Sequence, residues 1–395
     1  MKRWIFAPVF ASLLASCVSA PAAVVPAPVP AVRASVPVET RDPSELQVLF
    51  WDQVTQRDRF ARMEDFFAGV EAAPAAERRV LPRGEPLPAD MQAALDQAFA
   101  ANHAVGLIVL KDGQVRYERY ADGFGPERRW TSFSVAKSLT SALLGAALAD
   151  GSIASLDDPV TRYIPALAGT AYDGVTVGQV ATMTSGVAWN EDYADPDSDV
   201  AKMLLVPPRA GEPQSVTYAR TLTRAAPVGE GQWRYNTLET NLLGDIVAAA
   251  TGKSLAAYAK EKIVDPAGFA GPLFWMDDLT GRNIGGCCLS LRLSDYARFG
   301  QWVLEGGEGV VPNGWFTRAG APYASFPQRP GYGYGYQWWS YPGGAFGAQG
   351  IFGQGITIDP EQRLVVAIVS NQPKATGGPE RADWNLLFAQ LRALQ

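Results

Sequence analysis

Apolar runs near both ends of the chain give the clearest structural signal. Residues 104–110 are apolar throughout, residues 114–120 alternate between apolar and polar, and the turn sequence Lys111-Asp112-Gly113 lies between them. This pattern is typical of a β-hairpin. Residues 355–360 and 364–369 give a second pair of predicted strands near the C-terminus. Because strands joined by short turns run antiparallel, we predict one antiparallel sheet built from both ends of the chain.

The stretch between the two strand pairs has mainly helical patterns. We expect the sheet to come from roughly residues 95–135 and 330–395, and a largely helical subdomain over roughly residues 140–320. Shorter amphipathic patterns predict helices over residues 92–102 and 381–394. Strands and helices are therefore segregated along the chain instead of alternating, which indicates an α+β fold class.

The first residues have the pattern of an export signal. Met1-Lys2-Arg3 precede an apolar stretch over residues 4–15, which is typical of a secretory signal peptide and is too short to span a bilayer. The sequence Leu14-Ala15-Ser16-Cys17 resembles the bacterial lipobox, which implies cleavage before Cys17 and lipidation of its thiol. A plain signal peptide cut near residues 18–20 is the alternative.

The segment that follows the signal is dominated by Pro, Ala and Val, a composition that favours extended chain over a packed core. We therefore predict a lipoprotein-type signal peptide over residues 1–16, a tether over residues 17–43 and a folded domain over residues 44–395. The protein is expected to be exported to the bacterial cell envelope and held to the membrane only by its lipid anchor. Val18 after the cysteine, where Asp could stand, favours the periplasmic side of the outer membrane.

Composition narrows the function classes. Hydrophobic residues make up 47% of the chain and the formal net charge is -6, so the basic surplus of a nucleic-acid-binding protein is missing. His103 is the one histidine, which argues against a Ser-His-Asp triad and against a zinc site. We expect His103 on the surface or at a strand edge, and we predict no metal or cofactor. The adjacent Cys287 and Cys288 are expected to be buried free thiols that act as small apolar residues.

The segment 131–140 contains the candidate nucleophile. Ser134 and Lys137 are three residues apart at the start of an Ala- and Leu-rich stretch that predicts a helix to about Ala149, so their side chains share one helix face. Free N–H groups and the helix dipole stabilise negative charge in the first turn. A Ser and a Lys on a solvated face would give the same motif, but a helix with so few charges is expected to be buried. Because burial lowers the pKa of a lysine, Lys137 is the predicted base for Ser134.

Several ordered blocks over roughly residues 95–375 resemble the serine β-lactamase-like superfamily, on its class C side. S-x-x-K is a nucleophile motif of that superfamily, and residues 150–165 and 175–186 resemble the segments that follow it. The resemblance implies a β-lactamase/transpeptidase-like fold. It also identifies Tyr235 as the partner of Ser134 and Lys137 that carries a proton to the leaving group.

The tyrosine block departs from the β-lactamase pattern Tyr-x-Asn, because Thr237 stands where Asn is expected. The sequence Tyr235-Asn236-Thr237 is instead similar to that of 6-aminohexanoate-dimer hydrolases and family VIII carboxylesterases. A core aromatic residue is the alternative interpretation of Tyr235.

The third block of the superfamily corresponds to Ala348-Gln349-Gly350. Ala348 replaces the lysine that holds the substrate carboxylate in β-lactamases, which removes a charge-assisted contact worth about 1.5–3 kcal/mol. Gly350 lets the strand approach closely. The resemblance implies that the backbone N–H groups of Ser134 and Ile351 form an oxyanion hole.

The substrate-binding residues are less defined. The resemblance to the nylon-oligomer hydrolases suggests that Tyr193 contacts the scissile amide, and Gly350 borders the same site; a plain loop aromatic is the alternative for Tyr193. The aromatic run Tyr332, Tyr334, Tyr336, Trp338, Trp339 is expected to be mostly structural, with one or two members in the acyl pocket. The acidic residues of the loop 191–199 are expected to be solvated, and could attract a cationic end of a substrate.

These observations together predict a serine hydrolase that cleaves an ester or amide bond of a small molecule through an acyl-enzyme. A penicillin-recognising D,D-peptidase or β-lactamase is one alternative. A catalytically degenerate binding protein of the cell envelope is the other, and the retained Ser134, Lys137 and Tyr235 argue against it.

Overall fold

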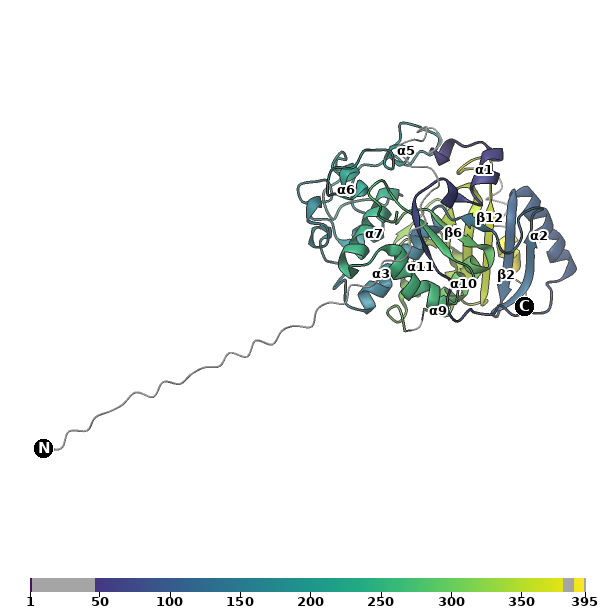
Figure 1. Ribbon diagram of the computed structural model, residues 1–395. Helices are drawn as coiled ribbons and strands as arrows, with labels where there is room; N and C mark the ends of the chain where they lie inside the picture. The colour runs from purple at the N-terminus through teal and green to yellow at the C-terminus, as the bar shows by residue number, and fades with distance from the viewer. Residues whose placement is uncertain (2–46, 308, 379–386, 394–395) are drawn as a thin grey trace.

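The computed structural model describes Met1 and residues 47–307, 309–378 and 387–393. Its largest element is an antiparallel sheet of eight strands in the order β3-β2-β12-β11-β10-β9-β8-β7, seen to the right of centre in Figure 1. The strands are β2 (Ala104–Lys111), β3 (Gln114–Tyr120), β7 (Ala324–Ser325), β8 (Gly333–Tyr334), β9 (Trp339–Ser340), β10 (Phe346–Gly350), β11 (Gln354–Asp359) and β12 (Leu364–Ser370). Strands from the two ends of the chain pair through β2 and β12, which confirms the predicted α+β class and this part of the sheet.

The tight turn between β2 and β3 follows from its residues. Asp112 and Gly113 both have positive φ, 52° and 73°, which suits the right-handed twist of a two-residue hairpin. Along β2 the side chains alternate between two covered faces. Leu107 and Val109 belong to one apolar core, and Ile108 belongs to the other. Burial on both faces explains why this strand is apolar from Ala104 to Leu110, up to the part-buried Lys111 at its end.

Helices cover both faces of the large sheet. On one face lies α2 with the helical residues 387–392, and on the other lies α10, which contacts β2, β11 and β12. The predicted helix over residues 381–394 lies partly outside the described residues. The helices are α1 (Gln53–Arg59), α2 (Ala89–Ala101), α3 (Val135–Ala149), α4 (Val177–Ala181), α5 (Asp199–Lys202), α6 (Gln214–Ala219), α7 (Thr237–Thr251), α8 (Leu255–Ala259), α9 (Asp265–Ala267), α10 (Leu293–Leu304) and α11 (Trp315–Gly320).

Short helical turns complete the described structure. They are the 3-10 turns η3 (Val48–Phe50), η4 (Met63–Asp65), η5 (Val160–Arg162), η6 (Pro165–Leu167), η8 (Pro342–Gly344) and η9 (Ile351–Gly353), and the π-helical turn η7 (Lys260–Val264).

A second, four-stranded sheet corrects the sequence prediction of a single sheet. Its order is β1-β5-β6-β4, with β1 (Gly69–Ala72), β4 (Arg129–Thr131), β5 (Leu273–Met276) and β6 (Leu289–Arg292). Two of these strands lie within the segment 140–320 that was predicted to be largely helical, and β4 belongs to this sheet instead of the large one. The strands are only three or four residues long and pair with distant segments, so no local periodicity indicates them.

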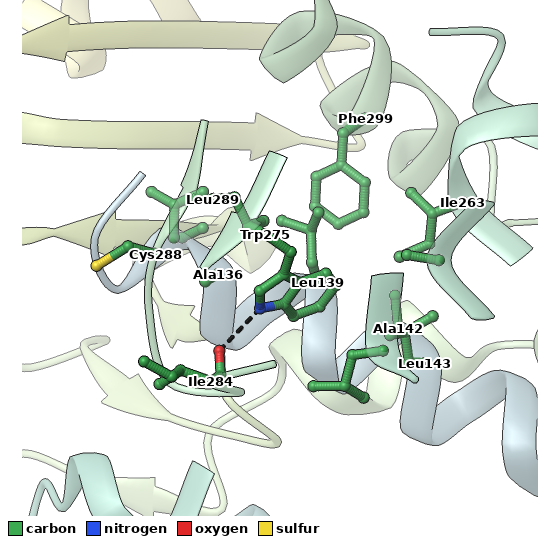
Figure 2. Close-up of a cluster of buried hydrophobic side chains, with 14 of the residues drawn as sticks. Ala136, Leu139, Ala142, Leu143, Ile263, Trp275, Ile284, Cys288, Leu289 and Phe299 are labelled. Atoms are coloured by element: carbon green, nitrogen blue, oxygen red, sulfur yellow. Dashed lines mark hydrogen bonds between the residues drawn. The ribbon is translucent and has the colours of Figure 1, made fainter. Parts of the chain in front are cut away.

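Helix α3 lies in the centre of the molecule, and the small sheet packs against it. Figure 2 shows Leu139, Ala142 and Leu143 of this helix beside Trp275 and Leu289 of the small sheet. The indole N–H of Trp275 donates to the carbonyl of Ile284 over 2.8 Å. From Val135 to Ala147 every residue of α3 is buried, so the start of this helix is held rigidly.

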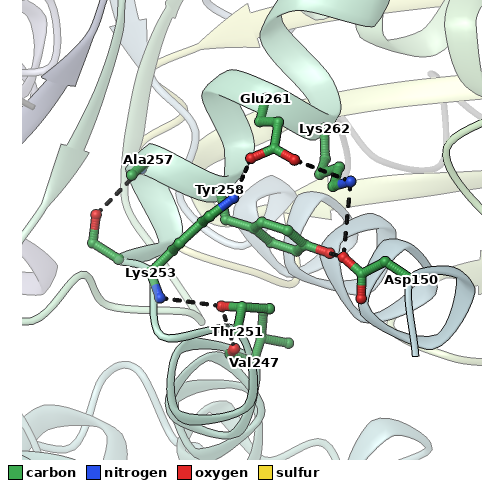
Figure 3. Close-up of polar contacts among 9 residues, drawn as sticks. Asp150, Val247, Thr251, Lys253, Ala257, Tyr258, Glu261 and Lys262 are labelled. Carbon is green, nitrogen blue, oxygen red and sulfur yellow. Dashed lines mark hydrogen bonds and ion pairs between the residues drawn. The ribbon is translucent and has the colours of Figure 1, made fainter. Parts of the chain in front are cut away.

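Polar contacts fix the C-terminal end of the same helix. Asp150 follows α3. Its carboxylate accepts a 2.7 Å hydrogen bond from Tyr258 and forms an ion pair with Lys262 at 3.8 Å, as Figure 3 shows. Lys262 also pairs with Glu261 at 3.1 Å. The contacts tie α3 to α8 and to the turn η7 that follows it.

The predicted signal peptide, the lipidation of Cys17 and the tether over residues 17–43 lie outside the described residues. Within the part of the chain that the structure describes, no helix is both long and apolar enough to cross a membrane.

Candidate active site

Ser134 and Lys137 lie at the start of α3 as the sequence motif indicated. Ser134 is the N-cap residue of the helix and is half-buried. Lys137 lies one turn further, is 1% exposed, and donates to the Ser134 hydroxyl oxygen over 3.0 Å. Phe133, directly before the serine, has a φ of 43°, a strained conformation that is typical of functional loops. The local geometry therefore presents a serine hydroxyl to a buried amine.

The environment of Lys137 favours its neutral form. Burial lowers the pKa of the amine, and the nearby Glu191 carboxylate opposes that shift in part. The amine has a second acceptor, the carbonyl of Gly286 at 2.8 Å. Gly286 is held in turn by the Asn241 side chain of α7, which accepts from its N–H over 2.8 Å. Sequence analysis missed Gly286, which has no motif and lies far from Lys137 along the chain.

Tyr235 comes to this pair from the loop that leads into α7. The amine of Lys137 lies 5.3 Å from the centroid of its ring. The ring stacks on Trp339 of β9, with centroids 5.6 Å apart, and meets Tyr334 edge-on at 5.8 Å. Tyr235, predicted from a second block of the sequence, thus lies beside the Ser134–Lys137 pair, and aromatic packing holds its ring.

Met183, in the block over residues 175–186, supports the loop that carries Tyr235. The carbonyl of Met183 accepts from the N–H of Arg234 over 3.1 Å, and the sulfur of Met183 accepts from the N–H of Asn236 over 3.4 Å. Asn236 is the N-cap of α7, and its side chain accepts from the N–H of Glu239. Tyr235 therefore lies between a supported loop and a capped helix.

The end of β10 lies against the loop that carries Ser134. A Cβ atom at Gly350 would lie 2.5 Å from the carbonyl oxygen of Ser132, so only glycine permits this approach. The following residue, Ile351, lines the same cavity as Ser134. Ala348 is 1% exposed and brings no charge to this strand.

The expectation that the acidic residues of the loop 191–199 are solvated is wrong for Glu191. Its carboxylate accepts hydrogen bonds from the Tyr193 hydroxyl at 2.7 Å and the Thr237 N–H at 3.0 Å, and also from the Thr237 hydroxyl and the Trp189 indole. Burial, and after it the Glu191 carboxylate, raises the pKa of Tyr193. These contacts could not be predicted from the sequence, because Glu191 is one of five acidic residues in a polar loop.

A cavity of about 150 Å³ opens beside Ser134. Tyr193, Thr237, Cys287, Cys288 and Ile351 line it near the serine. Both cysteines are free thiols, as expected, but only Cys288 is buried; Cys287 is half-buried and faces the cavity. The expectation of two buried thiols is therefore wrong for Cys287.

His103 and the aromatic residues over 332–339 do not line the cavity at Ser134. His103 is exposed in the turn before β2 and lines a different hollow from Ser134. None of the five aromatic residues over 332–339 lines the cavity that opens beside Ser134. Trp339 packs on Tyr235 instead. In the described part of the chain, no group of three or more His, Cys, Asp or Glu residues is placed to hold a metal ion.

Comparison with known sequences gives a consistent picture. The profile of the family described as Beta-lactamase matches residues 91–391. The 6-aminohexanoate-dimer hydrolase of Paenarthrobacter ureafaciens is 31% identical over 322 residues, which cover 74% of this chain and 77% of that protein. Esterase EstB of Burkholderia gladioli is 31% identical over 214 residues, 46% of this chain and 50% of that one.

Comparison with solved structures supports the fold. A Bacillus anthracis protein provisionally designated a 6-aminohexanoate-dimer hydrolase is similar with a TM-score of 0.76 and 23% identity, and the match covers 89% of this chain and 98% of that one. A class C β-lactamase is similar with a TM-score of 0.57 and 16% identity over 77% and 95% of the two chains. The β-lactamase/transpeptidase-like fold predicted from the sequence is confirmed.

Proposed function

The chain belongs to the Beta-lactamase family and is a serine hydrolase, and from this we propose that it cleaves an ester or amide bond through an acyl-enzyme formed on Ser134. Lys137 is the proposed base and Tyr235 the proposed proton donor. The observation that carries the proposal is the buried amine of Lys137, 3.0 Å from the serine hydroxyl.

The proposed first step forms the acyl-enzyme. The Ser134 oxygen attacks the substrate carbonyl while its proton passes to the neutral Lys137 amine. The oxygen of the tetrahedral intermediate accepts from the N–H groups of Ser134 and Ile351, and the loss of one such donor typically costs about 3–4 kcal/mol. Tyr235 donates its proton to the leaving alcohol or amine as the bond breaks, and it regains a proton from Lys137.

The proposed second step is hydrolysis of the acyl-enzyme. A water molecule attacks the ester carbonyl and gives its proton to the Tyr235–Lys137 pair. The same pair returns a proton to Ser134 as the acid departs. One water is consumed for each bond cleaved, and the three side chains return to their starting protonation states.

Ester or amide substrates without a carboxylate beside the scissile bond fit this site better than β-lactams. The lysine that would hold such a carboxylate is replaced by Ala348, a buried residue. The relative that matches 74% of this chain is named a 6-aminohexanoate-dimer hydrolase, which supports the same choice.

A fluorophosphonate probe tests the nucleophile. We expect the probe to label the wild-type protein at Ser134 and to leave Ser134→Ala unlabelled, whereas Ser138→Ala should still react. Ser138 is buried in the same helix, and its hydroxyl donates to the carbonyl of Gln337 at 2.8 Å, so it is a matched control. Labelling that persists in Ser134→Ala contradicts the proposal.

Parallel assays on p-nitrophenyl esters, the 6-aminohexanoate dimer and nitrocefin test the substrate class. We expect turnover of an ester or amide and little of nitrocefin. Stable labelling by a fluorescent penicillin together with nitrocefin turnover would favour a penicillin-recognising enzyme instead.

A further inference from the structure

Two adjacent glycines, Gly285 and Gly286, bond to side chains of both α3 and α7. From α3, the hydroxyl of Thr140 donates to the carbonyl of Gly285 over 2.7 Å, and the amine of Lys137 donates to the carbonyl of Gly286 over 2.8 Å. From α7, the side-chain oxygen of Asn241 accepts from the N–H of Gly286 over 2.8 Å. All three hydrogen bonds are buried, so water does not compete for them.

The segment lies so close to α7 that it requires a glycine. A Cβ atom at Gly286 would lie 2.7 Å from the side-chain oxygen of Asn241 and 3.0 Å from the carbonyl oxygen of Thr237, so a larger residue would displace the oxygen that holds it. Thr237 and Asn241 share one face of α7, and Tyr235 lies two residues before the start of the same helix. One helix therefore positions the proposed proton donor and, through Asn241, the carbonyl to which the lysine amine bonds.

The carbonyl of Gly286 orients the amine of Lys137 for proton transfer. A neutral amine has two N–H groups and one lone pair, and only the lone pair can take the proton of Ser134. One N–H is directed to the Gly286 carbonyl at 2.8 Å, and the serine oxygen lies 3.0 Å from the same nitrogen, so the lone pair can turn towards the hydroxyl. After the transfer, the ammonium group already has an acceptor in place and the site needs no rearrangement.

Asn241 supplies its acceptor without adding a charge. Burial lowers the pKa of Lys137, and the charges of Glu191, Cys287 and Cys288 oppose this shift. A carboxylate at position 241 would act in the same direction as Glu191, because a nearby anion favours the ammonium form. Both side chains bond to the same glycine, so such a charge would lie within about 10 Å of the amine. An amide holds the glycine and leaves the amine neutral.

Resting on the proposed acyl-enzyme mechanism, we propose that Asn241 is a positioning residue for the base: through Gly286 it fixes the amine of Lys137 against Ser134, and it does so with an uncharged group. Asn241 acts through the glycine and not on the substrate. A residue with this role controls kcat and its pH profile, whereas a residue needed only for packing controls stability.

Two substitutions at position 241 separate geometry from charge. Asn241→Leu removes the acceptor for the Gly286 N–H, and kcat for ester hydrolysis should fall by about 10–100-fold, the cost of a small misplacement near the reacting groups, with KM little changed. Asn241→Asp keeps the acceptor and adds a charge. On the rising part of the pH profile its kcat/KM should be about tenfold below that of the wild type, and most of the activity should return on a plateau at higher pH.

Asn371→Leu is the matched control. Asn371 is 4% exposed, its side chain donates to the carbonyl of Gln53 over 3.1 Å, and it lines a different hollow from Ser134. This variant should lose thermal stability as Asn241→Leu does, and should keep the wild-type kcat and pH profile. Active sites are counted by complete fluorophosphonate labelling, so a partly folded preparation is corrected for its active fraction.

The outcomes separate this inference from the proposed function. Labelling of Ser134 in the wild type, together with a kcat of Asn241→Leu within about threefold of the wild type, overturns the role of Asn241 and leaves the hydrolase intact. An Asn241→Asp pH profile that coincides with the wild-type profile also overturns it, and this measurement decides alone if Asn241→Leu does not fold. Failure of the probe to label Ser134 overturns both proposals.

Discussion

Replacing Lys137 by methionine separates the catalytic role of this residue from its place in the core. Methionine nearly matches the aliphatic part of lysine in length and volume, so the change leaves no large void in the buried start of α3. It removes the amine that lies 3.0 Å from the Ser134 hydroxyl and 2.8 Å from the Gly286 carbonyl.

The two effects differ in size. The carbonyl of Gly286 loses its buried donor, which costs about 1–3 kcal/mol, and removal of a buried amine offsets part of this. The free energy of unfolding should therefore fall by no more than about 3 kcal/mol, which corresponds to a decrease in Tm of less than about 10 °C. Loss of the proposed base should lower kcat by about 10²–10⁴, or roughly 3–5 kcal/mol of transition-state stabilisation.

Thermal unfolding and ester hydrolysis on the same preparation measure both effects. Lys202→Met is the matched control, since Lys202 is exposed and its nearest carboxylate, that of Asp197, lies at 3.8 Å; both quantities should stay near the wild-type values. A kcat of Lys137→Met within tenfold of the wild type would refute the reasoning about the base. A variant that does not fold would show that the lysine is needed for the core, and the pH profile of the wild type would then have to identify the base.

Three further expectations follow from the same contacts. Because burial lowers the pKa of Lys137 and the unprotonated amine is the proposed base, kcat/KM should rise with pH and level off below pH 10.5, the ordinary lysine value; a profile that is still rising above that pH counts against Lys137. Gly350→Ala should lower kcat by about 10²–10³, the value of one oxyanion-hole donor, because its Cβ would lie 2.5 Å from the Ser132 carbonyl. Gly355→Ala, whose Cβ would have its nearest neighbour at 3.6 Å, should change kcat little, and equal losses in the two variants would exclude this explanation. Finally, Cys17→Ser should move the exported protein from the membrane fraction to the soluble fraction, and unchanged partitioning would contradict the predicted lipid anchor.

The regular parts of the fold could be predicted because their signals are local. An apolar run, a turn with Asp112-Gly113 and an alternating run determine the β2–β3 hairpin within seventeen residues. The second sheet could not be predicted in this way. Its strands are too short for a periodic pattern, and β1 and β5 lie about 200 residues apart in the sequence. Their pairing depends on how the helices between them pack.

Within the candidate site, too, some residues could be identified from local signals and others depend on the packing of distant segments. Ser134 and Lys137 could be identified from the sequence because one helical turn brings them together whatever surrounds the helix. The superfamily resemblance, and not spacing, indicated Tyr235 and Ile351. Gly286 could not be predicted at all, because its role depends on a carbonyl group that the fold brings 2.8 Å from the lysine amine across 149 residues.

The sequence by itself determined the serine, the lysine one turn later, the α+β class and the absence of a lysine at Ala348. Only the tertiary structure decided that Glu191 turns inward to hold Tyr193 and Thr237. It alone also decided that Tyr334 and Trp339 pack against Tyr235 and that a mainly apolar cavity opens beside Ser134. The physical reason is that a residue type and its local spacing determine what a side chain can do, whereas burial and neighbours come from packing between distant segments.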